Sequence, residues 1–262
     1  MNLSLEGKNA FVCGSTQGIG KEAAIELASL GARITLIARS EEELKKVVNE
    51  LPSNHSQKHD YIVADFSKPN DLRSKAEEYV SKDVTVHILV NNTGGPSGGA
   101  ITDAKTDEFI STFNNHLLCN HILMQAVLPG MKTAGYGRII NVISTSVRQP
   151  IKGLGVSNTI RAAVGNWSKT LSFEVAKFGI TVNNVLPGST KTQRLKSIFE
   201  ANAKLKNTSV EEVEALALRE IPAGRFGAPE EVANAIAFLA SPAAAYINGV
   251  NLAVDGGRTV AL

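Results

Sequence analysis

A glycine cluster close to the N-terminus constrains this chain more than any other stretch. The apolar run at residues 10–13 leads directly into Gly14, Gly18 and Gly20, and a helical pattern follows at residues 21–28. Gly14 allows the end of a strand to turn sharply, Gly18 allows backbone to approach a ligand, and Gly20 allows a helix to pack closely on the strand. The stretch therefore predicts a buried strand, a tight turn and a helix.

This turn has the properties of a phosphate-binding site. The first N–H groups of a helix have no partner within the helix, and the helix dipole places its positive end there. Both features favour a pyrophosphate at the turn. An ordinary strand-to-helix turn can carry the same glycines, so other parts of the chain have to decide between the two interpretations.

The composition indicates a cytoplasmic globular protein. With 262 residues, 43% of them hydrophobic, the chain can fill a large core. A net charge of +2 without a basic tract gives no indication of a nucleic-acid or membrane partner. Cys13 and Cys119 cannot form a disulfide framework, residues 1–7 lack the features of a signal peptide, and no apolar run approaches the roughly 18 residues of a membrane span. No metal site is expected.

Strand-like and helical patterns alternate along the whole chain. Short apolar runs predict strands at residues 10–13, 32–38, 61–65, 84–90, 138–143, 180–186 and 250–254. Helical patterns occupy residues 21–28, 41–50, 69–82, 107–132, 157–178 and 229–239. This alternation predicts an α/β fold, a Rossmann-type doubly wound parallel sheet, in a single domain over residues 1–262. The polar stretch 189–220 is expected to be a helical lid, although a plain surface excursion would have the same composition.

Five motifs occur in order at the expected elements. They are the glycine turn at 14–20, Asp65 after the third strand, Asn91-Asn92-Thr93-Gly94 after the fourth, Pro187-Gly188 with Thr192 after the sixth, and the ending NLAVDGG at 251–257. With these motifs the sequence resembles the short-chain dehydrogenase/reductase family over nearly its whole length, with the 3-oxoacyl-[acyl-carrier-protein] reductases as the nearest general type. The resemblance implies a nicotinamide dinucleotide, hydride transfer at a carbonyl carbon and a homotetramer.

The resemblance also implies which residues hold the dinucleotide. The expected cofactor-binding residues are Gly14, Ser15, Gln17, Gly18, Ile19, Gly20, Arg39, Asp65, Phe66, Asn91, Gly94, Pro187, Gly188, Thr190 and Thr192. In the family the residue matching Asp65 contacts the adenine, but a carboxylate at this position can also simply cap a loop. Thr192 is expected to help hold the carboxamide, with a helix cap of the lid as the alternative.

The choice between NADP and NAD depends on the end of the second strand. An acidic residue there would accept hydrogen bonds from a ribose 2′-OH and favour NAD, but this chain has Arg39 and no carboxylate. A guanidinium pairs with a 2′-phosphate through a planar, permanently charged fork. NADP is therefore expected, and NAD remains possible because Gln17 stands where many NADP-dependent relatives have a second basic residue. A solvated surface role is the alternative for Arg39.

The catalytic positions depart from the family pattern. The family uses Asn, Ser, Tyr and Lys, and here Ser144 matches the catalytic serine. The tyrosine position holds Ser157, the lysine position holds Arg161, and the helix position of the asparagine aligns on His116. The catalytic candidates are therefore Ser144, Ser157, Arg161 and His116.

These replacements alter the proton chemistry. A serine hydroxyl is a much weaker acid than a phenol, and an arginine cannot exchange a proton because its pKa is above roughly 12. His116 can titrate near neutrality and could supply the lost acid if it reaches the carbonyl, although a packing role with satisfied hydrogen bonds is the simpler interpretation. Ser144 and Ser157 could instead act as paired hydrogen-bond donors to a developing alkoxide.

The sequence therefore leaves two alternative functions open. One is an NADP-dependent reductase of a ketone or a 3-oxoacyl thioester, with an atypical Ser/Arg active site. The other is a catalytically impaired dinucleotide-binding protein that acts as a sensor or as an oligomer partner. The basic side chains of the lid fit an anionic substrate such as an acyl carrier thioester, and equally fit a solvated surface: Lys191, Arg194, Lys196, Lys204 and Lys206.

Overall fold

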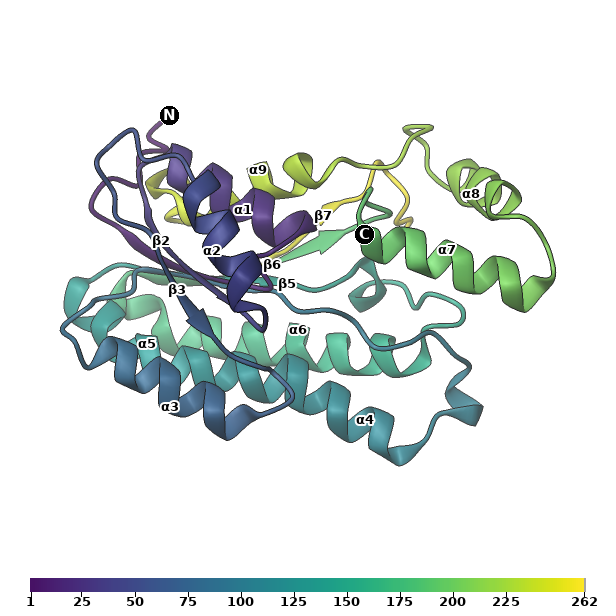
Figure 1. Cartoon of the computed structure of the whole chain (residues 1–262), viewed down its shortest axis with the longest axis horizontal. Coiled ribbons are helices and arrows are strands. Elements are labelled where there is room, and N and C mark those ends of the chain that lie inside the picture. Colours follow the sequence, from purple (N-terminus) through teal and green to yellow (C-terminus); the bar gives the residue numbers. More distant parts are fainter. Residues whose placement is uncertain (262) are drawn as a thin grey trace.

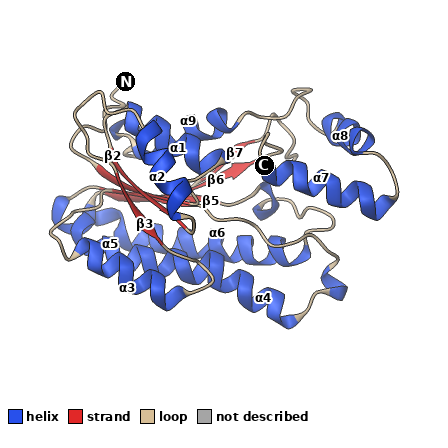
Figure 2. Cartoon of the chain, in the orientation of Figure 1, coloured by secondary structure: helices blue, strands red, loops and turns tan. Residues whose placement is uncertain are grey.

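The fold is built on one seven-stranded sheet, which a computed structural model describes for residues 1–261 (Figure 2). Every neighbouring pair of strands is parallel, in the order β3-β2-β1-β4-β5-β6-β7. The strands are β1 (Asn9–Cys13), β2 (Arg33–Ala38), β3 (Asp60–Val63), β4 (Ile88–Asn91), β5 (Gly137–Val142), β6 (Ile180–Pro187) and β7 (Asn251–Val254). The predicted doubly wound parallel sheet is confirmed.

Helices cover both faces of this sheet (Figure 1). On one face lie α1 (Gly18–Ser29), α2 (Glu41–Glu50) and α9 (Pro229–Ala240); on the other lie α3 (Pro69–Val80), α4 (Thr106–Phe113), α5 (Cys119–Ala134) and α6 (Gly155–Val175). Each face has its own apolar core, with Leu27, Ile34 and Ile236 in one and Phe11, Leu89 and Leu123 in the other. The central strands are largely apolar because helices bury both of their faces.

The strand order reverses beside β1. Strand β1 pairs with β2 on one side and with β4 on the other. Successive strands are therefore added on one side of β1 up to β3, and on its other side from β4 onward. In open parallel sheets of this kind, ligands bind outside the carboxyl ends of the strands at such a switch point. The glycine turn after β1 lies at this place.

Several element boundaries differ from the sequence prediction. Strand β4 begins at Ile88 rather than at residue 84, because the Asn9 side chain donates to the Thr85 carbonyl and the Asn9 N–H donates to the His87 ring. The helical region expected at 107–132 is interrupted by a π-helical segment, Asn114–Leu118. Helix α6 begins at Gly155, two residues earlier than expected, and thus includes Ser157 in its first turn.

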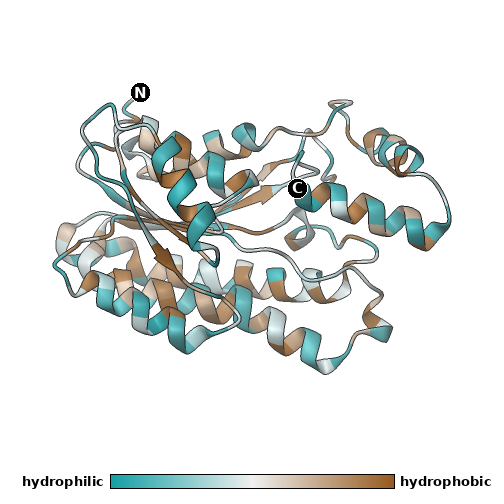
Figure 3. Ribbon diagram, in the orientation of Figure 1, coloured by the Kyte–Doolittle hydropathy of each residue, from teal (hydrophilic) through white to brown (hydrophobic). Residues whose placement is uncertain are grey.

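The stretch 189–220 is helical, as predicted, and it contains two helices. They are α7 (Gln193–Lys206) and α8 (Val210–Arg219), and they extend beyond the end of the sheet in Figure 1. They bury a small apolar cluster of their own, in which Phe199, Val213 and Phe226 are buried. Figure 3 shows mixed polar and apolar residues on both helices, which fits elements with one covered face.

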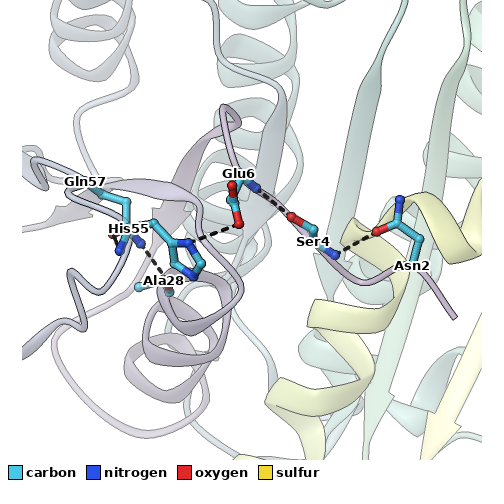
Figure 4. A network of polar contacts seen from close by, with 6 residues as sticks. All are labelled: Asn2, Ser4, Glu6, Ala28, His55 and Gln57. Atoms are coloured by element: carbon cyan, nitrogen blue, oxygen red, sulfur yellow. Dashed lines mark hydrogen bonds and ion pairs between the residues drawn. The ribbon is translucent and has the colours of Figure 1, made fainter.

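Polar contacts fix the N-terminal segment against α1 and the loop before β3 (Figure 4). The Ser4 N–H donates to Asn2 over 3.1 Å, and the Glu6 N–H donates to the Ser4 hydroxyl over 3.3 Å. His55 Nδ1 lies 3.1 Å from Glu6, and Gln57 donates to the Ala28 carbonyl over 2.7 Å. This network joins the start of the chain to α1 and to the loop before β3.

Three further findings concern residues 1–261. Their helices include none with the length and apolar character that a membrane span requires. Their His, Cys, Asp and Glu side chains form no group of three or more that could hold a metal ion. Cys13 and Cys119 are both buried and free, and burial raises the pKa of the Cys119 thiol to about 12.

Candidate functional site

The glycine turn after β1 leaves no space for side chains. Gly14 adopts φ +57°, and a Cβ on Gly14 would lie 2.7 Å from the Asn92 carbonyl oxygen. A Cβ on Gly20 would lie 2.2 Å from the Gly14 carbonyl oxygen. Gly18 adopts φ +56° and faces the methyl group of Thr192. The three expected roles, a sharp turn, a close approach and tight helix packing, therefore agree with the local geometry.

The start of helix α1 has free donors. Gln17 is the N-cap residue, but its side chain makes no capping hydrogen bond, and the first turn carries no acidic residue. Ser15 is fully buried, and its Oγ has no partner among the described residues. Ile19 packs against the apolar core of this face and so fixes the turn. Unpaired N–H groups, an unpaired hydroxyl and a positive dipole end together fit a bound pyrophosphate.

The end of β2 presents a free cation. Arg39 is exposed, and no hydrogen bond or ion pair to it is found within residues 1–261. The Asp65 carboxylate accepts from the Ser67 N–H over 2.9 Å, and this bond, with the nearby Arg39 charge, lowers the pKa of Asp65. The loop-capping role considered for Asp65 is thus present. Phe66 is buried, and its carbonyl accepts from the Cys119 thiol.

Asn91 has a structural role that the sequence did not indicate. It is the last residue of β4, and its amide donates to Asn141 over 2.9 Å. Asn141 donates to Asn184 over 2.9 Å, and Asn184 donates to Asn251 over 2.7 Å. These four residues, which we call the asparagine row, are paired in register across β4, β5, β6 and β7. The Asn91 side chain therefore holds strands together, and only its Oδ1 is left without a partner among the described residues.

Asn92 is a residue that the motif contained but the role assignment missed. Its amide donates to the carbonyls of Cys13 and Gly14 over 3.3 and 3.2 Å, and thus fixes the glycine turn. Gly94, two residues further on, has no atom within 4 Å of a Cβ placed on it. Gly94 therefore borders open space, which agrees with its expected place beside a ligand.

The segment after β6 forms the wall opposite the glycine turn. The Gly188 N–H donates to the Val254 carbonyl over 2.9 Å, directly after Pro187 ends the strand. The Thr190 hydroxyl donates to the Gly188 carbonyl over 3.2 Å. The Thr192 hydroxyl accepts from the Leu195 N–H and donates to the Thr190 carbonyl, so Thr192 is the N-cap of α7. The helix-cap alternative for Thr192 is the one present, and its methyl group faces Gly18.

Ser144 lies at the carboxyl end of β5. It adopts an extended conformation, and its Oγ accepts from the Ser146 N–H over 3.1 Å. It is only partly buried. Because the hydroxyl accepts this bond, its own proton remains available for a substrate oxygen.

Ser157 and Arg161 lie one turn apart on α6. The Arg161 Nε donates to the Ser157 Oγ over 3.2 Å, and its Nη1 donates to the carbonyls of Ile143 and Val142 over 2.7 and 3.4 Å. Both side chains are buried. The guanidinium polarises the Ser157 hydroxyl and leaves the proton of that hydroxyl free to donate. Burial, with the nearby Arg194 charge, lowers the pKa of Arg161 to about 10, so the guanidinium still carries its charge at neutral pH.

His116 does not titrate near neutrality. It lies in the π-helical segment with 4% of its surface exposed. Burial and the charges of Arg161 and Arg194 lower its pKa to about 3, although a hydrogen bond with the Gly94 backbone opposes the shift. The expectation that His116 titrates near neutrality is therefore wrong, because its protonation would bury a third positive charge close to Arg161 and Arg194.

The phenols within residues 1–261 have other partners. Tyr79 bonds Thr35, Tyr136 donates to the Ala240 carbonyl, and Tyr61 donates to Glu41. Tyr246 is fully exposed. The prediction that none of them replaces the missing tyrosine agrees with these contacts, and the proton donors next to the site are serine hydroxyls.

Comparison with known proteins supports the same interpretation of the fold. Residues 14–259 match the family model described as enoyl-(acyl carrier protein) reductase. The chain is 34% identical to the 3-oxoacyl-[acyl-carrier-protein] reductase FabG of Vibrio cholerae, over 97% of this chain and 98% of the relative. It is 35% identical to the FabG of Pseudomonas aeruginosa over the same shares.

Solved structures share the whole fold. The L-sorbose reductase of Gluconobacter frateurii, complexed with NADPH and L-sorbose, is 30% identical and superposes with a TM-score of 0.92 over 100% of both chains. A variant of actinorhodin polyketide ketoreductase with NADPH is 31% identical, with a TM-score of 0.89 over 97% of both chains. The family model, the curated relatives and the shared fold agree, and the chain belongs to the short-chain dehydrogenase/reductase family.

Proposed function

We propose that this protein is an NADP(H)-dependent carbonyl reductase whose proton donors are serine hydroxyls. The observation that carries the proposal is the turn after β1, where three tightly packed glycines precede an uncapped helix N-terminus, while the exposed Arg39 follows the neighbouring strand β2. Relatives with the same fold are reductases, and two of the solved structures hold NADPH. When bound, the nicotinamide supplies a hydride to the carbonyl carbon, and the oxygen gains one proton, so that the product is an alcohol.

The residues of this chain have separable tasks in that reaction. Ser144 and Ser157 each accept a hydrogen bond from the protein, which leaves two hydroxyl protons for the carbonyl oxygen. Arg161 polarises Ser157, and its charge favours negative charge developing on that oxygen. The proton comes finally from water, because neither serine can stay deprotonated near neutral pH.

The cofactor part of the proposal is tested by binding. Titration of nicotinamide fluorescence should show that NADPH binds more tightly than NADH, and Arg39→Asp should weaken NADPH binding by about 10- to 100-fold, since a charge-assisted hydrogen bond contributes about 1.5–3 kcal/mol. Lys177→Asp changes the charge equally, in the turn before the start of β6, and is the control. Equal affinities for the two cofactors before and after Arg39→Asp would refute the role of Arg39.

The catalytic part is tested by turnover. With NADPH and a panel of ketones and 3-oxoacyl thioesters, Ser144→Ala and Ser157→Ala should each lower kcat by about 100-fold, because one lost oxyanion donor costs roughly 3 kcal/mol. Thr159→Ala removes an exposed hydroxyl of the same helix and should change little. If neither serine variant slows the reaction, the paired-donor role is wrong.

A second candidate is a dinucleotide-binding protein without efficient turnover, acting as a sensor or an oligomer partner. The replacement of the family tyrosine and lysine by Ser157 and Arg161 favours it. The Ser157→Tyr, Arg161→Lys double variant separates the two candidates. A large gain of activity over an inactive parent supports the second candidate, and a loss of activity supports the reductase.

A further inference from the structure

Two arginines from different elements meet beside the loop that follows β4. Arg161 lies on α6 and Arg194 lies in the first turn of α7. The Arg161 Nη2 is 3.2 Å, and the Arg194 Nη2 is 3.5 Å, from the position that a Cβ would occupy on Gly95. Arg194 also donates to the Pro96 carbonyl. We call these two residues the arginine pair.

The arginine pair has no counter-charge. None of the ion pairs found within residues 1–261 includes Arg161 or Arg194. Burial lowers the pKa of both guanidinium groups, and each contributes to keeping nearby His116 neutral. Arg161 is buried, whereas Arg194 is exposed at the rim. The hydrogen-bond partners of Arg161 are uncharged oxygens, and a second guanidinium lies beside it. Since buried charges in folded proteins are usually paired with an opposite charge, this arrangement favours an anion at the arginine pair.

The geometry of the arginine pair suits a small planar anion. Both Nη2 atoms approach the same side of Gly95, the side on which a side chain would begin, and no hydrogen bond occupies the Nη2 of Arg161 among the described residues. A charge-assisted N–H···O bond is about 2.8 Å long, so one carboxylate can accept from both guanidinium groups. Gly95 has no side chain to fill the space between them.

The distance to the catalytic hydroxyl limits the size of the ligand. Arg161 donates through its Nε to Ser157 and presents its Nη2 to the Gly95 side. One guanidinium group therefore separates the bound anion from the Ser157 hydroxyl, which would donate to the reacting carbonyl. We propose that the arginine pair binds the carboxylate of the substrate, and that the protein reduces short-chain keto acids; this rests on the proposed reductase function.

Other anions fit this position less well. The phosphate of an acyl carrier arm is separated from its thioester by a long flexible chain, so it cannot reach the arginine pair while its carbonyl contacts Ser157. The cofactor pyrophosphate has its own site at the start of α1. Ribose hydroxyls could accept hydrogen bonds from Arg161, but they carry no charge to compensate the pair.

The test compares keto acids with their neutral esters. The substrates are 2-, 3- and 4-oxopentanoate and the methyl ester of each, reduced with NADPH by the full-length protein. We expect at least one acid to exceed its ester by about 30-fold in kcat/KM. Arg194→Met should reduce that ratio to about threefold or less, by raising KM for the acid and leaving the ester unchanged. Lys196→Met removes one charge from the same helix and should keep the ratio.

Two binding measurements separate this proposal from the reductase function. In calorimetry, the NADPH complex should bind the preferred oxopentanoate, or the tightest-binding one if none is reduced, and Arg194→Met should weaken that binding about tenfold with no change in NADPH affinity. No turnover of any carbonyl together with Arg194-dependent acid binding refutes the reductase and retains the carboxylate site. Four results would each overturn the carboxylate site. They are equal kcat/KM for acids and esters, equal losses in Arg194→Met and Lys196→Met, no binding of any oxopentanoate, and a loss of NADPH affinity in Arg194→Met that matches its loss of acid binding.

Discussion

The asparagine row lies in the sheet and the arginine pair lies on helices α6 and α7, and the two sets of polar side chains differ in the partners that they have. In the row, each buried amide of β4, β5 and β6 donates to the next strand. In the pair, Arg161 is buried beside the exposed Arg194, and no carboxylate pairs with either among the described residues. Buried amides that bond one another specify a structure, whereas a buried cation with no opposite charge favours binding of an anion.

Interrupting the asparagine row should have the largest effect on stability. Asn141→Leu leaves the Asn91 amide without an acceptor and the Asn184 Oδ1 without a donor, both in the interior. Each unsatisfied buried group costs about 1–3 kcal/mol, so we expect a loss of about 2–5 kcal/mol in the free energy of unfolding. Urea unfolding followed by circular dichroism measures this loss.

The matched control is Asn251→Leu at the partly exposed edge of the row. Asn184 would keep its second bond, to the Ser168 hydroxyl over 2.7 Å, so the cost should be only about 1 kcal/mol. Equal losses in the free energy of unfolding for Asn141→Leu and Asn251→Leu would show that burial does not set the cost of interrupting the asparagine row.

Acid should destabilise the protein through His116, which lies beside the arginine pair. Its folded pKa of about 3 is below the unfolded value of about 6.5. A depressed folded pKa contributes stability above the unfolded pKa, and that stability is lost as the pH falls from about 6.5 towards 3. Between pH 7 and pH 5 the loss should be about 2 kcal/mol, because protonation would add a third unpaired cation.

His116→Gln isolates this effect. Urea unfolding of wild type and variant at pH 7, 6 and 5 should show a steeper fall for the wild type. His59 and His87, whose burial also lowers their pKa, are present in both proteins and cancel in the difference. A difference between the two proteins that is independent of pH would show that His116 is not held neutral by its surroundings.

The sequence predicted what depends on local pattern. Apolar runs located the strands, and the glycines at 14, 18 and 20 located the turn, because period and spacing determine both. The four-residue spacing of Ser157 and Arg161 already places the two side chains on one helix face, and the structure joins them by a hydrogen bond.

The remaining features depend on pairing between distant segments. The asparagine row requires the register of four strands, which no single segment reveals. Arg194 was one of several basic residues of the lid, and only its position beside Gly95 distinguishes it from solvated lysines. The pKa of His116 was misjudged because its burial and its charged neighbours come from tertiary packing.

Removing Arg194 should have the smallest effect on the free protein. Arg194→Met loses one hydrogen bond, to the Pro96 carbonyl, but it also removes the like charge beside Arg161. Since one hydrogen bond is worth about 0.5–1.5 kcal/mol and the lost repulsion offsets part of it, the change in the free energy of unfolding should stay below about 0.5 kcal/mol. Urea unfolding without ligands measures it. A loss above about 1 kcal/mol would show that Arg194 stabilises the fold itself, and the contrast with the asparagine row would then disappear.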